Sequence, residues 1–378
     1  MPRHAEARID TTAVAHNVGL LNALAGPARL CVVVKADGYG HGAVEVSRAA
    51  LAAGASHLAV ALVEEGIELR TAGLRAPVLL LSEPPADALA EAWEWDLTPT
   101  LYHPDAVARA AAVVGRDGRW GVHVKVDTGM HRVGATPQDA VALAAAVLGS
   151  GNLVLEGVFT HLAVADEPDR PETAQQLDRF AAVVGALRDA GIDPGIVHAA
   201  NSAGLIAHPA ARLDMARVGI AAYGIAPSPA LEGRVDLWPA MSVHAEVSHV
   251  AMVPAGEGIS YGLRHVVDVD TTVAVVPLGY ADGVRRALGS SGGSVLIGGV
   301  RRPIRGAVTM DQTVVEVGPA GDPSVVPVQQ GDEVVLLGSQ TGPGGTDRIT
   351  ASEWAERIGT IPYEVVCGFG ARLPRTYP

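Results

Sequence analysis

The chain has 378 residues, of which 48% are hydrophobic and 18% charged, and it carries 44 glycines and a formal net charge of −13. This composition describes a globular protein that is long enough for two domains, and it excludes a disordered chain. The acidic balance argues against nucleic acid as a partner, because binding phosphates requires basic clusters and the sequence has none.

The cysteines and the N-terminal stretch indicate the compartment. Cys31 and Cys367 lie far apart and form neither a disulfide framework nor a zinc motif, so we expect a reducing environment and no metal. The stretch MPRHAEARIDTTAVAHN lacks an apolar signal core, and no segment is apolar over a membrane-spanning length. We therefore expect a cytoplasmic protein with no membrane partner.

The first part of the chain, to about residue 220, alternates short β-branched runs with longer alanine-rich amphipathic stretches. This alternation predicts an α/β fold, a TIM-like (β/α)8 barrel. The expected strands are Leu30–Lys35, His57–Ala61, Val78–Leu81, Thr98–Tyr102, Gly121–Val126, Leu155–Thr160, Ile196–Ala199 and Met215–Val218. Among the expected helices are Ala43–Ala53, Val63–Thr71, Asp105–Val114, Gln138–Leu148 and Thr173–Asp189.

After Trp238 the helical periodicity nearly ends, and runs such as TTVAVVPLGY and DEVVLLG alternate with glycine and proline turns. We expect a barrel domain at residues 1–236 and a C-terminal mostly-β domain at residues 237–378, with the first few residues able to pair with the second domain. One helix is expected within that domain, in SEWAERIG, where Thr350 and Glu353 have capping-box spacing.

The stretch CVVVKADGYGHGA places Lys35 at the end of an apolar strand. Burial disfavours the charged ammonium form, and a neutral amine can attack a carbonyl. The following glycines allow a tight turn toward a helix near Ala43, and such a helix start suits a phosphate. Lysine and phosphate together suggest a phosphorylated aldehyde, although a lone lysine at a strand end is more often a solvated cation.

Several polar residues share the position of Lys35. They stand at or next to the predicted C-terminal end of a strand, the face on which barrel enzymes build their sites. These residues are Lys35, Lys125, His161, Asn201 and Arg217. Five such residues from different strands predict one functional site.

A series of strings in this order resembles the alanine racemase family: VVKADGYGHG, KVDTGMHRVG, FTHLAVADE, HAANSAG, RVGIAAYG, GEGISYG, PLGYADG, AVTMDQ and TIPYEVVCG. The resemblance implies a barrel that binds pyridoxal 5′-phosphate, followed by a β domain. It also implies a homodimer whose active sites are shared between subunits, and an isomerase that interconverts L-alanine and D-alanine for peptidoglycan, the cell-wall polymer.

The resemblance implies two catalytic bases, because racemisation removes a proton from one face of the α-carbon and returns one to the other. Lys35 resembles the lysine that forms a Schiff base with the cofactor and acts as one base. Tyr261 resembles the second base, which reaches in from the partner subunit. A phenol needs help to act as a base, and His161 and Arg217 resemble the hydrogen-bonded chain that gives this help.

Further residues resemble the family's cofactor ligands. Arg217 resembles the arginine that faces the pyridine nitrogen; because it donates, that nitrogen stays unprotonated and the ring is a weaker electron sink. The positions that resemble phosphate ligands, or residues beside them, are Tyr39, Asn201, Ser202, Gly219, Ile220 and Tyr363, the last of which also resembles an entrance residue.

Other residues resemble the family's substrate contacts. Arg132 resembles a contact of the substrate carboxylate and the cofactor's phenolic oxygen, and Met310, beside Asp311, resembles a backbone donor to that carboxylate. Lys125 matches a position where the lysine can be carbamylated, although an unmodified lysine paired with an acid is an open alternative. Tyr280 resembles a gate residue. For Met310, Tyr280 and Tyr363, packing in the core or in an interface is an alternative to a role in the site.

Other functions remain open at this point. Ala307 and Thr309 depart from the family's usual string around Met310, so substrate contacts there can differ. The alternatives are a racemase of broader or serine-directed specificity, a decarboxylase with the same barrel, a non-catalytic pyridoxal-phosphate carrier, and an unrelated Schiff-base aldolase. Arg217 argues against the decarboxylase, and the second domain argues against the carrier.

Overall fold

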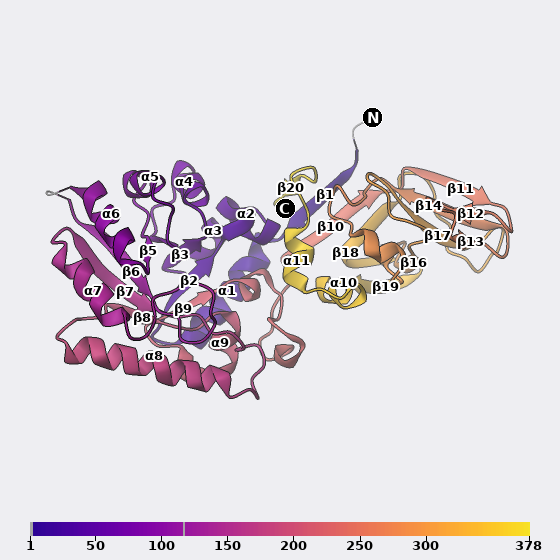
Figure 1. Ribbon diagram of the computed structural model, residues 1–378. Helices are drawn as coiled ribbons and strands as arrows, with labels where there is room; N and C mark the ends of the chain where they lie inside the picture. The colour runs from indigo at the N-terminus through magenta and orange to yellow at the C-terminus, as the bar shows by residue number, and fades with distance from the viewer. Residues whose placement is uncertain (1–2, 116–117) are drawn as a thin grey trace. The chain divides into compact units, whose positions relative to one another are not determined.

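The computed structural model of the chain describes residues 3–115 and 118–378 (Figure 1). The chain divides into two compact units. The barrel unit comprises residues 12–38 and 42–238, and the sheet unit comprises the residues up to Thr11, residues 39–41 and residues 239–378. The expected domains at 1–236 and 237–378 stay a prediction, and Met1 and Pro2, where the first begins, lie outside the described residues. Within the described ranges, no helix is long and apolar enough to cross a membrane.

Eight parallel strands form the barrel, and their residues are almost entirely buried, as expected for strands covered on both faces. They are β2 (Arg29–Val33), β3 (His57–Val60), β4 (Val78–Leu80), β5 (Thr100–Leu101), β6 (Trp120–Lys125), β7 (Leu153–Phe159), β8 (Ile196–His198) and β9 (Met215–Val218). Each expected strand is therefore confirmed to within a few residues at its ends.

The strands close into a ring in sequence order. Two ladders, β9-β2-β3-β4 and β5-β6-β7-β8, contain all eight strands. A parallel bridge from Leu79 to Thr98 joins β4 to the segment just before β5. Between β8 and β9, the backbone N–H of Asp214 donates to the carbonyl of Val197 at 3.0 Å. The sequence prediction of a TIM-like barrel is confirmed.

Helices follow the strands on the outside of the barrel, as α6, α7 and α8 show in Figure 1. The helices of this part of the chain are α1 (Thr11–Ala25), α2 (Lys35–Gly40), α3 (Ala43–Ala52), α4 (Val63–Thr71), α5 (Leu89–Glu94), α6 (Pro104–Val114), α7 (Ala140–Gly149), α8 (Glu172–Asp189) and α9 (Ser202–Ala207). The five predicted helices are confirmed, whereas the short α2, which begins at Lys35, was not anticipated.

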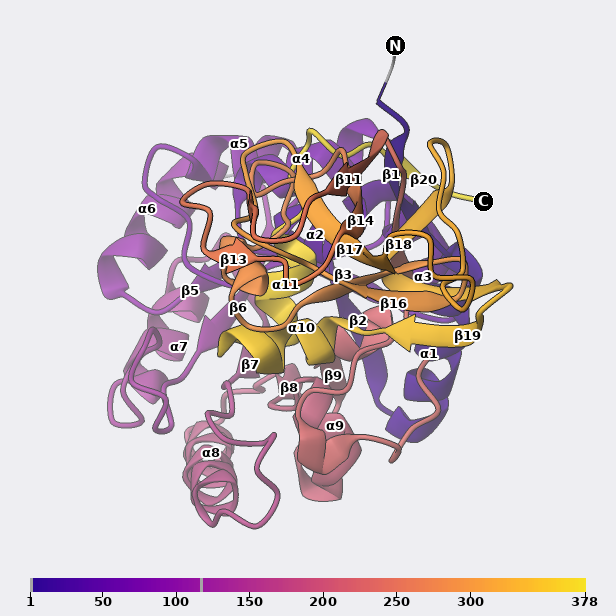
Figure 2. The ribbon, with the colours of Figure 1, turned by 90° about the vertical axis from the view of Figure 1, so that its right-hand side faces the viewer.

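The sheet unit is mostly β, as predicted, and β1 (Ala5–Ile9) pairs antiparallel with β10 and parallel with β20, near the C-terminus (Figures 1 and 2). Its largest sheet runs β16-β15-β18-β10-β1-β20, with β19 paired to β18. These strands are β10 (Met241–Glu246), β15 (Ser294–Ile297), β16 (Val300–Pro303), β18 (Glu333–Gly342), β19 (Gly345–Ile349) and β20 (Arg375–Thr376). Two smaller sheets contain β11 (His249–Val253), β14 (Thr271–Val276) and β17 (Thr313–Pro319), and β12 (Gly258–Ile259) and β13 (His265–Val266).

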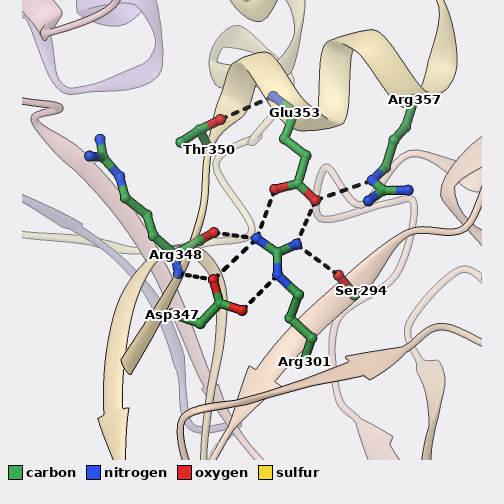
Figure 3. A network of polar contacts seen from close by, with 7 residues as sticks. All are labelled: Ser294, Arg301, Asp347, Arg348, Thr350, Glu353 and Arg357. Atoms are coloured by element: carbon green, nitrogen blue, oxygen red, sulfur yellow. Dashed lines mark hydrogen bonds and ion pairs between the residues drawn. The ribbon is translucent and has the colours of Figure 1, made fainter. Parts of the chain in front are cut away.

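A network of charged side chains fastens α10 (Ala351–Ile358) to this sheet (Figure 3). The hydroxyl of Thr350 accepts the backbone N–H of Glu353 at 3.0 Å, which confirms the predicted N-cap. The Glu353 carboxylate binds the Arg301 guanidinium through two bonds of 2.6 and 3.0 Å, and Asp347 binds the same guanidinium at 2.8 Å. Because the pairs form a bidentate network, α10 is held in one orientation on β16 and β19.

Candidate functional site

Lys35 lies two residues after the end of β2 and begins α2, where the backbone enters an unusual turn. The five residues of α2 that follow it all have positive φ angles: Ala36 (52°), Asp37 (52°), Gly38 (59°), Tyr39 (54°) and Gly40 (79°). Each non-glycine residue in this left-handed region costs about 1 kcal/mol, so other contacts must hold the turn. The glycines of this stretch predicted a tight turn here, but not five consecutive residues with positive φ angles.

Glu65, in the first turn of α4, holds this turn and was missed by sequence reasoning. One carboxylate oxygen accepts the backbone N–H of Ala36 at 2.7 Å, and the other accepts the N–H groups of Ala61 and Leu62 at 2.8 and 3.1 Å. The carboxylate therefore ties the residue after Lys35 to the end of the neighbouring strand β3. The only sequence signal was its capping position at the start of a helix.

Arg217, in β9, is 2% exposed, and its guanidinium is satisfied by neutral acceptors. Nη1 donates to Nδ1 of His198 at 2.7 Å, and Nη2 donates to the carbonyls of Thr160 and Ala199 at 2.8 and 3.1 Å. Nη2 also lies 3.3 Å from Nδ1 of His161. Burial lowers the pKa of Arg217 to about 10, so the side chain keeps its positive charge at neutral pH.

Two buried histidines extend the contacts of Arg217, and sequence reasoning missed both. Because Arg217 donates to Nδ1 of His198, the His198 proton lies on Nε2, which donates to Nδ1 of His123 at 2.9 Å. Burial, followed by the charge of Arg217, lowers the pKa of His198 well below its ordinary value. The spacing of His123, two residues before Lys125 in β6, places both side chains on one face of that strand and could have indicated it.

His161 and Lys125 belong to the same polar cluster as Arg217. Burial, followed by the charges of Arg217 and Arg132, lowers the pKa of His161 well below its ordinary value and that of Lys125 to about 8. Lys125 Nζ lies 3.4 Å from the carbonyl of Leu81 and 5.4 Å from the centre of the Phe159 ring. His161 is therefore a neutral imidazole beside a protonated arginine, and Lys125 is an amine that loses its proton easily.

The other predicted residues of this cluster lie in the segments that follow β6, β8 and β9. Arg132 is exposed, and Lys125 and His161 line a small cavity with it. The Asn201 side chain caps α9 by accepting the N–H of Gly204 at 2.8 Å. The buried hydroxyl of Ser202 accepts the N–H groups of Gly219 and Ala221 at 2.9 and 3.4 Å, and Ile220 lies between these two residues.

Lysine is rare in this chain, and both lysines lie at strand ends of the barrel. Of the 28 lysine and arginine residues, Lys35 and Lys125 alone are lysines. An arginine cannot lose its proton under ordinary conditions, whereas a lysine can. The protein thus uses arginine for its other basic side chains and places its two amines at the ends of two barrel strands.

In the sheet unit, Tyr39 and Tyr363 form an aromatic pair with ring centres 6.3 Å apart. Burial, followed by Tyr363 and Cys367, raises the pKa of Tyr39, so its phenol stays protonated. Arg375 donates from Nε to the carbonyl of Gly40 at 3.0 Å, which fixes the backbone beside Tyr39.

The remaining predicted residues lie on three connected loops of the sheet unit. Tyr261 is 76% exposed on the turn between β12 and β13. The preceding residue, Ser260, donates its hydroxyl to the carbonyl of Ala307 at 2.7 Å. Tyr280 donates its N–H to the carbonyl of Thr309 at 2.9 Å, and Ala281 donates to that of Met310 at 3.1 Å.

Asp282, which sequence reasoning also missed, anchors these loops. Its buried carboxylate accepts the N–H of Gly279 at 3.0 Å and pairs with Arg3 at 2.7 Å and Arg372 at 3.3 Å. Arg372 in turn binds Asp311 at 2.7 Å. The structure therefore brings Tyr261, Tyr280, Met310 and Asp311 onto neighbouring loops within this unit.

The chain matches family models in both halves: "Alanine racemase, N-terminal domain" over residues 9–227 and "Alanine racemase, C-terminal domain" over residues 240–377. The alanine racemase of Thermobifida fusca is 44% identical over 383 residues, an alignment that covers 100% of this chain and 99% of the relative. That of Symbiobacterium thermophilum is 45% identical over 373 residues, covering 98% of this chain and 96% of the relative.

Solved structures agree with these relatives. The alanine racemase from Bacillus anthracis with bound L-Ala-P superposes with a TM-score of 0.91 at 34% identity, covering 100% of this chain and 96% of that chain. The alanine racemase from the D-cycloserine producer Streptomyces lavendulae has a TM-score of 0.91 at 38% identity, covering 100% and 98%.

Proposed function

Because this chain belongs to the alanine racemase family, we propose that it interconverts L-alanine and D-alanine with pyridoxal 5′-phosphate as its cofactor. The observation that carries the proposal is the match to alanine racemases over the whole length of the chain. We further propose that the D-alanine supplies peptidoglycan synthesis in the cytoplasm, where the free thiols of Cys31 and Cys367 would stay reduced.

The polar groups of the barrel unit fit an anionic cofactor. Four cations, Lys35, Lys125, Arg132 and Arg217, each lower the pKa of His161, so positive charge accumulates around this imidazole. A phosphate needs hydrogen-bond donors, and the Ser202 hydroxyl lies beside the N–H groups of Gly219 and Ala221. When bound, pyridoxal phosphate supplies an electron-accepting ring that makes the α-proton of alanine easier to remove.

We assign the holding of this cofactor to the residues that resemble the family's cofactor ligands. Lys35 would hold it covalently, and Arg217 would donate to its ring nitrogen, because a guanidinium that stays protonated can only donate. The groups assigned to the phosphate and its surroundings are Tyr39, His161, Asn201, Ser202, Gly219, Ile220 and Tyr363.

The proposed proton transfers use one base on each face of the α-carbon. Lys35 serves one face, and Tyr261 of the partner subunit serves the other, with His161 and Arg217 assisting the phenol. Arg132 and the backbone N–H of Met310 orient the substrate carboxylate, and Lys125, carbamylated or not, supports Arg132. Tyr280 is the proposed gate residue, and Asp311 lies beside Met310 in the sequence.

A homodimer with shared sites is part of the proposal. Tyr261 and its neighbour Leu263 are 76% and 61% exposed, and Met310 is 51% exposed. Large side chains that stand this far out of a subunit are typical of residues that a partner covers. The exposure of Tyr261 therefore supports its placement in the site of the partner.

The test of the function is to incubate the cofactor-loaded protein with L-alanine in heavy water. We expect D-alanine that carries deuterium at the α-carbon, because the returned proton comes from a base that exchanges with solvent. A chiral column measures inversion and mass spectrometry measures deuterium. Exchange without inversion would remove the Tyr261 assignment, and neither exchange nor inversion would contradict the proposal. Repeating the assay with serine compares the racemisation rates of the two amino acids and tests the alternative of a serine-directed racemase.

Replacing Tyr261 by phenylalanine is expected to slow α-proton removal from L-alanine by at least about 100-fold, because one base is lost. Removal from D-alanine, assigned to Lys35, should fall far less. Loss of deuterium from each α-deuterated enantiomer in ordinary water measures both rates, and equal losses would contradict the two-base assignment.

Mixing subunits then tests the shared site. Neither Lys35→Ala nor Tyr261→Phe should racemise alone. After subunit exchange, half of the dimers are mixed and each contains one intact site, so about a quarter of the wild-type activity should return. An absence of recovery, with exchange verified by mass spectrometry, would mean that each site is built from one chain.

A further inference from the structure

Gln176 lies on the inner side of α8, and its amide group is fully bonded. The residue is 2% exposed. Its Oε1 accepts the backbone N–H of Ala163 at 2.8 Å, and its Nε2 donates to the carbonyl of His161 at 3.0 Å and to the hydroxyl of Thr128 at 3.2 Å. A buried amide that satisfies both donors and its acceptor is costly to replace, because each partner would lose a hydrogen bond away from water.

These bonds join two loops that carry proposed site residues. Thr128 lies on the loop between Lys125 and Arg132, and its hydroxyl also lies 2.8 Å from that of Thr160 at the end of β7. Arg179, one turn along α8 from Gln176, donates to the carbonyl of Thr128 at 2.8 Å. The helix therefore clamps the loop after β6 to the loop after β7.

The clamp acts at the residue whose ring faces Arg217. Gln176 holds the carbonyl of His161 and the N–H of Ala163, so the two peptide groups that follow the His161 α-carbon are fixed. The ring nitrogen Nδ1 is 3.3 Å from Nη2 of Arg217, which is at the long end of a hydrogen bond. A small shift of the His161 backbone would break this contact.

We propose that Gln176 is a positioning residue for the reaction, which sets the His161 ring against Arg217 by holding the His161 peptide. The inference rests on the proposed function, since it assigns to His161 a role in proton transfer at Tyr261 of the partner subunit. Gln176 itself touches neither substrate nor cofactor in this assignment.

The chain offers a matched pair of variants for the test. In Gln176→Glu, the carboxylate still accepts from Ala163 and can accept from the Thr128 hydroxyl, but it faces the His161 carbonyl with no donor. Gln175→Glu makes the same change at the neighbouring residue, which is exposed. Gln176→Met removes the bonds without adding charge. All variants are studied as full-length, cofactor-loaded protein, and rates are given per bound cofactor.

We expect kcat to fall roughly 10- to 100-fold in Gln176→Glu and Gln176→Met, with KM for alanine changed less than about threefold, because the site is misaligned rather than emptied. The α-deuterium isotope effect should rise for L-alanine and fall for D-alanine, since only the step assisted by His161 is slowed. Gln175→Glu should match the wild type in each measurement.

Hydrogen exchange gives a readout that does not depend on turnover. The amides of residues 161–165 should exchange faster in Gln176→Met than in the wild type or Gln175→Glu, because the clamp on this segment is lost. The inference would be overturned if the amides of residues 161–165 exchanged in Gln176→Met at the wild-type rate. It would also be overturned if kcat and the isotope effects were unchanged in both Gln176 variants. If the wild type does not racemise alanine at all, the proposed function fails separately, and the exchange measurement still decides whether Gln176 holds the loop.

Discussion

Replacing Lys35 by alanine is expected to abolish racemisation, with a fall in kcat of at least about 10,000-fold, and to remove the visible absorbance of the protein loaded with pyridoxal phosphate. The substitution removes the proposed covalent anchor and one of the two bases together. Chiral chromatography measures the first effect and absorbance spectroscopy measures the second.

The position of Lys35 makes this test specific. The residue follows β2 and precedes a left-handed turn that Glu65 holds through the Ala36 N–H at 2.7 Å. Because Glu65 binds the backbone and not the lysine side chain in that contact, alanine leaves the bond in place. Unchanged thermal unfolding would show that the fold persists, and a surviving absorbance band would show that the cofactor is attached elsewhere.

Replacing Arg217 by glutamine is expected to reduce kcat by about 100- to 1,000-fold, because a buried positive charge is removed from the site. It should also lower the free energy of unfolding by about 1–3 kcal/mol, because acceptors such as His198 Nδ1 and the Thr160 carbonyl lose donors. Arg188→Gln, an exposed change on α8, is the control. Kinetics and thermal unfolding measure the two effects.

The same variant makes a prediction about protonation. Burial contributes most to the low pKa of His161, and the positive charge of Arg217 contributes next. Removing that charge makes protonation of the imidazole less costly, so the pKa of His161 should rise, although burial keeps it below its ordinary value. The acid limb of the pH–rate profile should therefore move to higher pH. A histidine NMR titration that shows no upward shift would contradict the electrostatic link.

The barrel could be predicted from the sequence because its strands are buried on both faces and appear as short β-branched runs. Strand β9 is a clear case, since Met215–Val218 was predicted with the bounds observed. The predicted strand ends also indicated Lys35, Lys125, His161 and Arg217 as candidate site residues. The C-terminal ends of all strands in a parallel barrel lie on one face of the barrel, so residues at these ends are expected close together.

The supporting contacts could not be predicted, because each joins residues that are far apart in the sequence. His198 and His123 are 75 residues apart, and the bond between Arg217 and Thr160 spans 57 residues. Gln176 is likewise one polar residue among many on an amphipathic helix. Propensity and periodicity report the direction of a side chain, whereas these contacts depend on how distant elements pack.

The assignment of residues 39–41 to the sheet unit is a second feature that could not be predicted from the sequence. These residues belong to the sheet unit, although the sequence on either side belongs to the barrel unit. The ring of Tyr39 packs near that of Tyr363, which lies more than three hundred residues later in the printed sequence. A linear division of the sequence into two domains cannot express such an exchange of short segments.

The placement of both amines at the ends of barrel strands has a practical chemical consequence. Reagents that modify primary amines normally label the surface of a protein at many lysines. Here Lys35 and Lys125 are the whole set of lysine side chains, and Lys125 is buried. Apart from the terminal amine, every product of such labelling reports on one region of the barrel, so a single mass shift per chain can be assigned to Lys35 or Lys125 by peptide mapping.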